Sequence, residues 1–289
     1  MADLLDRVRT HVDVLAELIG ERSDRRPAAL EAARAFITRE LEAMGHTVVR
    51  YEYSTLSRPA VNLEVLLEGR SPDRPTLVVG AHYDTVWGTP GADDNASAVA
   101  ALLEIARDFA GKRPSRPVRL VFYDCEEPPH FGSEDMGSAH HARQCRERGE
   151  RLLGMICLES LGYYAREIDE RIPRPMYLRV LNGIFGNRNI IIVSDLGSIG
   201  FGLRFLARFV AAGLFPFLPA ALPQAFGAIS LSDHRCYWAY GYRALMVTDT
   251  AFLRNPNYHT PNDRLVTLDL PRLARLTRQL SRAIRRLAG

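Results

Sequence analysis

Apolar residues recur along the chain in two patterns, with helical spacing in some segments and in short continuous runs in others. Leu30, Ala33, Ile37 and Leu41 lie three or four positions apart, which predicts a helix over 27–44 with one buried face. Further helices are predicted at 94–110, 136–148 and 271–287. Apolar runs between turn residues predict strands at 47–53, 61–67, 76–79, 118–123, 153–158, 177–181, 189–193 and 244–248.

Strands and helices alternate through most of this order. We therefore expect an α/β fold, with a mostly parallel, mixed central sheet flanked by helices on both faces. The hydrophobic share of 47% is sufficient for a large core. Since neither a repeat nor a linker divides the sequence, we expect one domain over residues 1–289.

The most apolar stretch, at 201–226, is predicted to form a helix followed by an apolar loop. Arg204, Arg208 and three prolines within it argue against a membrane span. Three roles remain open for this stretch: a buried or pocket-lining position, a dimer contact, or a contact with a membrane surface.

The charge of the chain is nearly balanced, with 37 basic and 34 acidic residues and a formal net charge of +3. This balance indicates neither a nucleic-acid nor a membrane partner. The predicted C-terminal helix holds six arginines and no acid, which we interpret as a solvated basic face. The four cysteines form no Cys-x-x-Cys pair, so we expect free thiols in a reducing compartment. The first residues include acids and no apolar segment, so we expect no signal peptide and a cytoplasmic location.

Side chains that can bind a metal follow the ends of several predicted strands. They are His82 after 76–79, Glu126 and Glu127 after 118–123, Glu159 after 153–158, and His259 after 244–248. In open α/β sheets, ligands bind outside the carboxyl ends of the strands. We therefore expect these side chains to converge at one edge of the sheet.

Asp94, at the start of the predicted helix 94–110, completes this set. Imidazole nitrogens and carboxylate oxygens suit zinc and similar divalent ions. The charges of Asp94, Glu127, Glu159 and one hydroxide would balance those of two divalent ions, which makes burial of the site tolerable. Asp84 lies two residues after His82 and points the same way in an extended chain, so it is placed to orient the imidazole.

Single segments of this set also have plainer explanations. Asp93-Asp94-Asn95 fits a helix cap, and it matches half of a calcium loop, although Ala98 stands where that loop needs glycine. His130, His140 and His141 are expected to be exposed rather than to bind a metal. It is the ordered combination, with its members near strand ends, that predicts a metal site.

The combination resembles the co-catalytic zinc aminopeptidases of the bacterial leucyl type, a family that also includes glutamate carboxypeptidase II and glutaminyl cyclase. The matching segments follow the family's order over about residues 76–265. They are Ala81-His82-Tyr83-Asp84, Gly91-Ala92-Asp93-Asp94-Asn95-Ala96-Ser97, Glu126-Glu127, Leu158-Glu159-Ser160-Leu161-Gly162-Tyr163, Ser232-Asp233-His234 and Asn257-Tyr258-His259-Thr260-Pro261. The resemblance implies a phosphorylase/hydrolase-like zinc exopeptidase architecture.

The resemblance also implies how two zinc ions would be held. Asp94 would bridge the two ions. His82 and Glu159 would complete one site, and Glu127 and His259 would complete the other. The substrate would be a peptide or small amide whose free α-amine binds near one metal, which makes the protein an aminopeptidase.

Two catalytic roles follow from the same resemblance. Glu126 would be the general base that takes a proton from the attacking water and delivers it to the departing amine. Asp84 would support His82. Glu159 stands where the family often has aspartate, and Arg235-Cys236-Tyr237-Trp238 replaces the proline and phenylalanine that usually follow the Ser-Asp-His segment.

Other functions remain open beside the aminopeptidase. A related zinc amidohydrolase of the aminoacylase or carboxypeptidase type has the same ligand order, but it needs a longer gap than the 11 residues between His82 and Asp94. A glutaminyl-cyclase-like acyltransferase would use much the same residues. Since the same fold can carry different functions, a non-enzymatic binding module also remains open. The sequence does not specify the side-chain preference or the oligomeric state.

Overall fold

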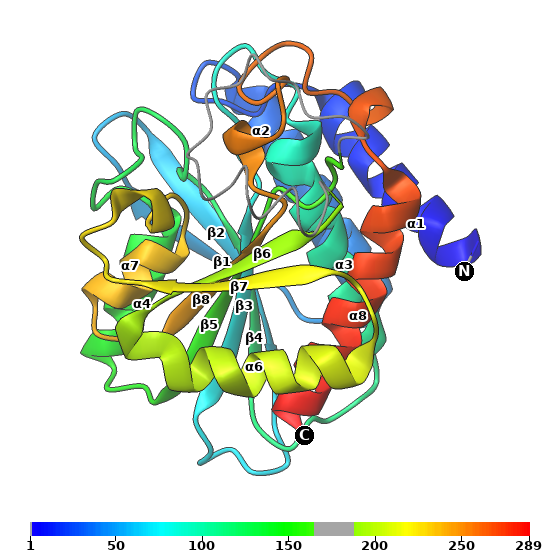
Figure 1. Ribbon diagram of the computed structural model, residues 1–289. Coiled ribbons are helices and arrows are strands. Elements are labelled where there is room, and N and C mark those ends of the chain that lie inside the picture. The colour runs from blue at the N-terminus through cyan, green and yellow to red at the C-terminus, as the bar shows by residue number, and fades with distance from the viewer. Residues whose placement is uncertain (1, 165–187) are drawn as a thin grey trace.

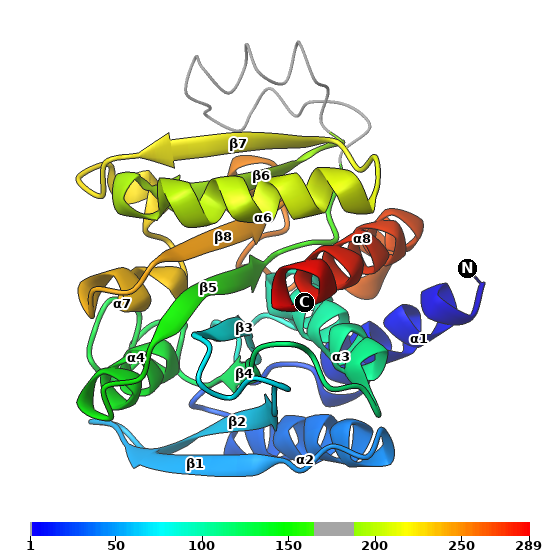
Figure 2. The same cartoon turned by 90° about the horizontal axis from the view of Figure 1, so that it is seen from below.

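A computed structural model describes residues 2–164 and 188–289, whose strands form one sheet (Figures 1 and 2). The strand order across the eight-stranded sheet of this described part is β1-β2-β4-β3-β5-β8-β6-β7. The strands are β1 Val49–Ser54, β2 Pro59–Leu67, β3 Thr76–His82, β4 Val118–Tyr123, β5 Leu152–Glu159, β6 Ile190–Asp195, β7 Phe217–Leu222 and β8 Ala244–Thr248. Strands from both halves of the chain thus lie side by side.

The centre of the sheet is parallel, and antiparallel pairs occur on both sides of it. β4, β3, β5 and β8 run parallel to one another. On one side β2 pairs antiparallel with both β4 and β1, and on the other β6 pairs antiparallel with β8 and parallel with β7. The predicted α/β fold with a mostly parallel, mixed sheet is confirmed.

Helices cover both faces of the sheet. They are α1 Ala2–Val12, α2 Pro27–Ala43, α3 Ala98–Phe109, α4 Gly137–Glu147, α6 Ile199–Ala212, α7 His234–Ala239 and α8 Leu270–Ala288. The larger apolar core joins one face to α1, α2, α3, α6 and α8, and a smaller one joins the other face to α4 and α7. Strands whose two faces are both covered carry side chains that are buried in succession, as in β4, where every residue is buried.

The apolar stretch at 201–226 differs from its prediction. The expected helix is present as α6, but the expected loop contains β7, which pairs with β6 from Phe217 to Leu222. Pro219 lies within β7, and an edge strand tolerates proline because one side of its backbone has no partner strand. The strand predicted at 177–181 lies outside the described residues. The sequence analysis did not predict α1.

The parallel centre places the predicted ligands at one edge of the sheet. His82 is the last residue of β3, and Glu159 is the last residue of β5. Glu126 follows the end of β4, which lies next to β3, and β8 lies next to β5. Within the described ranges, no helix combines the length and the apolarity that a membrane-crossing segment requires.

Candidate metal centre

The structure brings the predicted ligands together in two overlapping groups. His82, Asp94 and Glu159 form one group, and Asp94, Glu127 and His259 form the other. His82 Nε2 lies 3.3 Å from Asp94 Oδ1 and 3.2 Å from Glu159 Oε2. His259 Nε2 lies 3.0 Å from Asp94 Oδ2 and 3.3 Å from Glu127 Oε2. The two oxygens of Asp94 therefore face different histidines, and Asp94 belongs to both groups.

Atoms without hydrogen bonds show what these groups can hold. His82 Nε2, His259 Nε2 and Glu127 Oε1 are buried and make no hydrogen bond within the part of the chain that the structure describes. His82 Nδ1 contacts the backbone oxygen of Asp84 at 3.2 Å, so this nitrogen carries the proton and Nε2 presents its lone pair to the carboxylates. A lone pair that faces two carboxylate oxygens at these distances fits a cation bound by all three groups.

The negative charge of the cluster changes the pKa of its members. Burial by itself lowers the pKa of His82, but Glu126 and other nearby carboxylates raise it well above its usual range. Burial also lowers the pKa of His259, but Asp94 and Glu127 raise it to about 10. Burial, and then the charge of Asp94, raises the pKa of Glu127 to about 8. Each shift reflects an excess of buried negative charge, which protons or metal ions must balance.

Asp84 holds the backbone of the two neighbouring glutamates. Its carboxylate accepts hydrogen bonds from the backbone N–H groups of Glu126 at 3.2 Å and Glu127 at 3.1 Å. Its Oδ1 lies 3.5 Å from His82 Nδ1, and the imidazole N–H donates to the backbone oxygen of Asp84 instead. One residue thus fixes both the imidazole and the turn that carries the glutamates.

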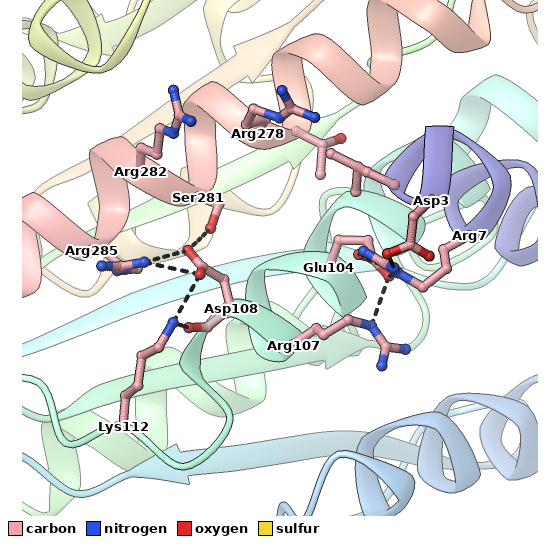
Figure 3. A pocket seen from close by; sticks show the side chains of 12 residues that line it. Asp3, Arg7, Glu104, Arg107, Asp108, Lys112, Arg278, Ser281, Arg282 and Arg285 are labelled. Atoms are coloured by element: carbon pink, nitrogen blue, oxygen red, sulfur yellow. Dashed lines mark hydrogen bonds and ion pairs between the residues drawn. The ribbon is translucent and has the colours of Figure 1, made fainter. Parts of the chain in front are cut away.

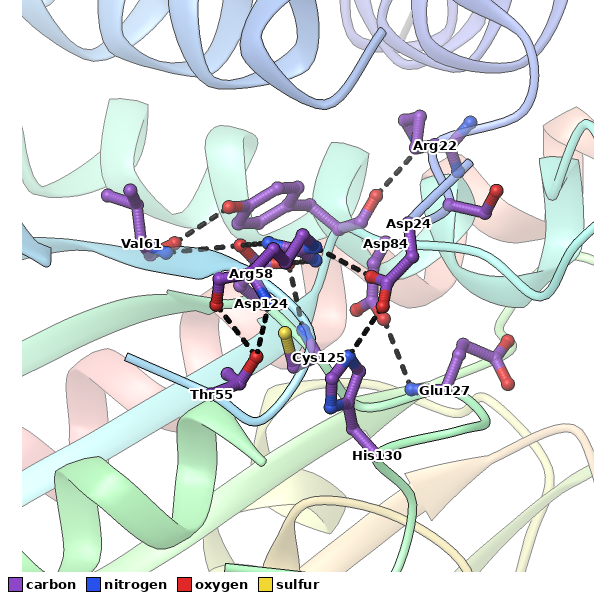
Figure 4. Close-up of polar contacts among 12 residues, drawn as sticks. Arg22, Asp24, Thr55, Arg58, Val61, Asp84, Asp124, Cys125, Glu127 and His130 are labelled. Atoms are coloured by element: carbon purple, nitrogen blue, oxygen red, sulfur yellow. Dashed lines mark hydrogen bonds and ion pairs between the residues drawn. The ribbon is translucent and has the colours of Figure 1, made fainter. Parts of the chain in front are cut away.

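A buried ion pair supports the same turn from the other side (Figure 4). Asp124, directly after β4, accepts hydrogen bonds from Arg58 at 2.7 and 2.9 Å and from Arg34 at 2.7 Å. Its Oδ1 also accepts the backbone N–H of Cys125, whose φ of 58° lies in the left-handed region. Such a backbone is strained for a residue other than glycine and persists where its surroundings hold it. This network turns the chain so that Glu126 enters the site.

A further carboxylate, Asp263, fixes the bridging aspartate. Its two oxygens accept the backbone N–H groups of Asp93 at 2.9 Å and Asp94 at 3.1 Å. Asp93 in turn accepts hydrogen bonds from Gly162 N at 2.8 Å and from Asn255 Nδ2 at 2.8 Å. The sequence analysis missed Asp263, and the one signal for it was an acid shortly after the predicted ligand His259.

Two serines orient Glu159. Ser232 donates to Oε2 at 2.7 Å, and Ser160 donates to Oε1 at 2.9 Å. Ser232 belongs to the Ser-Asp-His segment that the sequence analysis had singled out. Through Ser232, this segment contacts a residue of the metal groups. The longer side chain of glutamate therefore does not leave the carboxylate loose.

Two histidines that were expected to be exposed are buried, so that prediction is wrong. His130 contacts Asp24 Oδ2 through Nε2 at 2.8 Å (Figure 4). His141 contacts Glu64 Oε2 at 3.2 Å and the hydroxyl of Tyr237 at 2.5 Å. Ion pairs and hydrogen bonds make their burial tolerable, and local sequence does not show such distant partners.

An apolar cavity of about 110 Å³ opens beside the metal groups. It reaches Glu159 on one side and Tyr258, whose ring stacks on His259 at 3.8 Å, on another. β6, β7, β8 and the loop after β8 supply its mostly apolar wall, which includes Ile191, Val193, Ala220, Met246, Phe252 and Leu253. A side chain of a bound molecule can therefore enter an apolar pocket while its neighbouring polar atoms stay at the carboxylates.

Comparison with known proteins identifies a family over part of the chain and shared folds over nearly all of it. Residues 62–172 match the family model described as Peptidase family M28. The chain is also 37% identical over 215 residues to the Escherichia coli K12 protein named "Uncharacterized protein YfbL", covering 71% of this chain and 64% of that protein. The first curated relatives are all longer, since the chain spans 64%, 18% and 40% of their lengths.

Solved structures share the fold over nearly the whole chain. The zinc aminopeptidase BSAP from Bacillus subtilis has a TM-score of 0.75 at 13% identity, covering 97% of this chain and 94% of that one. A glutaminyl cyclase from Bacteroides thetaiotaomicron has a TM-score of 0.71 at 18% identity, covering 97% of both chains. At such identities the similarity shows the fold, whereas the match of residues 62–172 includes the segment from His82 to Glu159. Residues 62–172 thus match peptidase family M28, and the metal-binding groups and the fold agree with that match.

Proposed function

We propose that this protein is a zinc-dependent aminopeptidase that removes N-terminal residues from peptides. The observation that carries the proposal is the position of Asp94, whose two oxygens face His82 at 3.3 Å and His259 at 3.0 Å. A carboxylate shared in this way suits a pair of divalent ions, with Glu159 and Glu127 as the remaining ligands. The match of residues 62–172 to family M28 and the fold shared with a zinc aminopeptidase support the same function.

Bound zinc would supply Lewis acidity and would make a bound water more acidic. Glu126 is then the residue placed to move the proton. Its Oε2 lies 3.9 Å from His82 Nε2, at the border of the metal groups, and Asp84 holds its backbone. Burial, opposed by His82 but reinforced by Glu127, raises the pKa of Glu126 well above its usual range. A raised pKa suits a carboxylate that must take a proton from water and then give it to the departing amine.

The apolar pocket beside Glu159 suggests which N-terminal residues are preferred. A substrate whose amine lies near the carboxylates would place its first side chain in this cavity of about 110 Å³. The wall residues named above are aliphatic or aromatic, so burial of an apolar side chain is favourable there. We therefore expect leucine-like or aromatic N-terminal residues to be cleaved faster than charged ones.

The test is cleavage of a mixed peptide library by the zinc-loaded protein, followed by mass spectrometry, with Glu126→Gln beside it. Glu52→Gln, an exposed position on β1, is the matched control because it removes one carboxylate without touching the site. Stepwise trimming from the N-terminus is expected for the wild type and the control. Glu126→Gln should lose activity by about 10²–10⁴-fold while it retains its zinc.

Other results would redirect the assignment. Absence of trimming by the zinc-loaded wild type would contradict the aminopeptidase. Release of acyl groups from N-acyl amino acids would favour an amidohydrolase, and cyclisation of N-terminal glutamine would favour an acyltransferase. Metal-independent peptide binding, identical in wild type and Glu126→Gln, would favour a binding module.

A further inference from the structure

The outer face of α6 exposes apolar side chains along its whole length. Ile199, Leu203, Val210 and Leu214, which follows the end of the helix, are 39%, 61%, 54% and 93% exposed. Successive members lie four or seven positions apart, so they form one stripe along the outer face of the helix and just past its end. A helix whose outer face meets only water carries polar residues there. This stripe is therefore a candidate contact surface.

The charged side chains of α6 and α8 are all positive. Arg204 and Arg208 are exposed between its apolar residues, and neither α6 nor α8 contains an acid. α8 packs against α6 and exposes Arg275 and Arg282. We call the exposed stripe of α6, together with Arg204, Arg208, Arg275, Arg278 and Arg282, the arginine face. The nearly balanced total charge of the chain conceals this local excess.

Two cavities lie beside these arginines. A cavity of about 150 Å³ lies between the end of α6 and α8, where Leu214 meets Arg275, Arg278 and Arg282. A second cavity of about 520 Å³ lies on the other side of Arg278 and Arg282 and reaches α1 and α3 (Figure 3). Arg278 and Arg282 thus line both cavities, and each has space beside it for an anionic group.

The acids of the second cavity are already paired with other cations. Figure 3 shows Asp108 bonded to Lys112 and Arg285, and no dashed line reaches Arg278 or Arg282. Across residues 2–164 and 188–289, the side chains of Arg275, Arg278 and Arg282 have no ion pair or hydrogen bond. Their charges are therefore available to an external anion.

The positive charge continues to one edge of the sheet. Burial lowers the pKa of Arg116, and the charges of Arg74 and Arg204 lower it further, which shows that these three guanidinium groups lie in one field. Arg74 and Arg116 precede β3 and β4, whereas His82 and Glu126 lie at or beyond the ends of these strands. A partner on this side would therefore leave the metal groups open at the opposite edge.

We propose that the arginine face docks on the surface of an anionic membrane. Apolar side chains that project from a helix can enter the headgroup layer, while the arginines beside them bind lipid phosphates. A second copy of the chain fits less well, because a two-fold contact would bring each arginine row against its own copy. The hollow beside Leu214, lined by three arginines, has the charge that a phosphate headgroup requires.

The test is sedimentation of the full chain with lipid vesicles. One set contains phosphatidylcholine alone, and the other also contains about 30% phosphatidylglycerol, at about 0.1 M and about 0.5 M salt. Arg275→Glu/Arg282→Glu removes charge from the face, and Leu214→Glu removes its most exposed apolar group. The matched controls are Arg39→Glu/Arg146→Glu, exposed on α2 and α4, and Leu56→Glu, which is 99% exposed in the β1–β2 loop.

We expect binding to the anionic vesicles only, with most of it lost at the higher salt. The double arginine variant and Leu214→Glu should bind at least about tenfold more weakly, and the controls should bind like the wild type. Circular dichroism and thermal unfolding verify that all variants are folded. The proposal is overturned if the wild type does not bind anionic vesicles at the lower salt, or if the controls lose binding equally. Self-association that Leu214→Glu abolishes, without vesicle binding, would instead assign the face to a second copy.

Discussion

The guanidinium of Arg22 is fully buried beside the loop that leads from His82 to Asp94. It donates five hydrogen bonds of 2.7–3.0 Å to backbone oxygens, those of Leu15, Gly20, Tyr83, Pro90 and Gly91. The first two oxygens belong to the N-terminal region and the other three to the loop. Arg22 therefore ties the loop between His82 and Asp94 to the N-terminal region of the chain.

Replacement by methionine keeps the length of the side chain but removes all five donors. Each bond contributes about 1 kcal/mol net, and a buried acceptor that is left without a partner costs about 1–3 kcal/mol. If about half of the oxygens find other partners, Arg22→Met loses about 3–5 kcal/mol of the free energy of unfolding. Burial lowers the pKa of Arg22 to about 10, so the group remains charged at neutral pH. Lysine keeps this charge, but it cannot span both sides of the loop and should lose about half as much.

The assay is urea unfolding of the metal-free protein, followed by a competition measurement of zinc affinity. Arg26→Met is the matched control, because the Arg26 side chain is 68% exposed and its nearest carboxylate is 3.9 Å away. We expect the control to change the free energy of unfolding by less than about 0.5 kcal/mol. Arg22→Met should also bind zinc about ten- to hundredfold more weakly, since the loop no longer fixes Asp94 relative to His82.

A loss below about 1 kcal/mol for Arg22→Met would refute this reasoning, because it would mean that the five bonds are replaced almost completely. A large loss of stability with unchanged zinc affinity would refute the link to the metal groups. Arg22→Lys distinguishes the two effects of the side chain. Recovery of full stability by lysine would show that charge, rather than the shape of the guanidinium, holds the loop.

Three further predictions concern the site and its surroundings. Asp94→Asn should reduce zinc at both positions and Glu159→Gln at one, measured as stoichiometry by atomic emission; equal losses would contradict the bridging role. Ala220→Phe should slow release of large N-terminal residues about tenfold or more but spare alanine, measured as kcat/KM on a dipeptide series. Burial by itself raises the pKa of Glu104, but hydrogen bonds from His11 and Arg7 on α1 outweigh it and lower the pKa from 4.5 to about 2. Its stabilising contribution should therefore be complete above about pH 4.5 and lost toward pH 2, so wild type and Glu104→Gln should converge in acid unfolding; a constant difference would contradict this.

Much of the site followed from local sequence because burial leaves a local signal. Continuous apolar runs indicated β3, β4 and β5, and polar residues at their ends indicated where the chain leaves the core. Since parallel strands end at one edge, His82, Glu126 and Glu159 could be expected to meet before any coordinates were known. The order of the segments then supported the family resemblance.

The residues that support the site from distant parts of the chain could be identified only from the tertiary structure. Arg22, Arg58 and Asp263 act on residues that are 61 to 170 positions away, and no periodic pattern reports such a partner. Local sequence also did not distinguish β7 from a loop, because an edge strand needs only one neighbour and tolerates Pro219.

The outer face of α6 shows the same division between sequence and structure. The sequence determined that 201–226 is apolar and that the C-terminal helix is basic. Only the packing of α6 against α8 decided which apolar residues enter the core and which remain outside beside the arginines. The physical reason is that periodicity fixes which residues share a face of a helix, whereas the neighbours that cover that face come from distant parts of the chain.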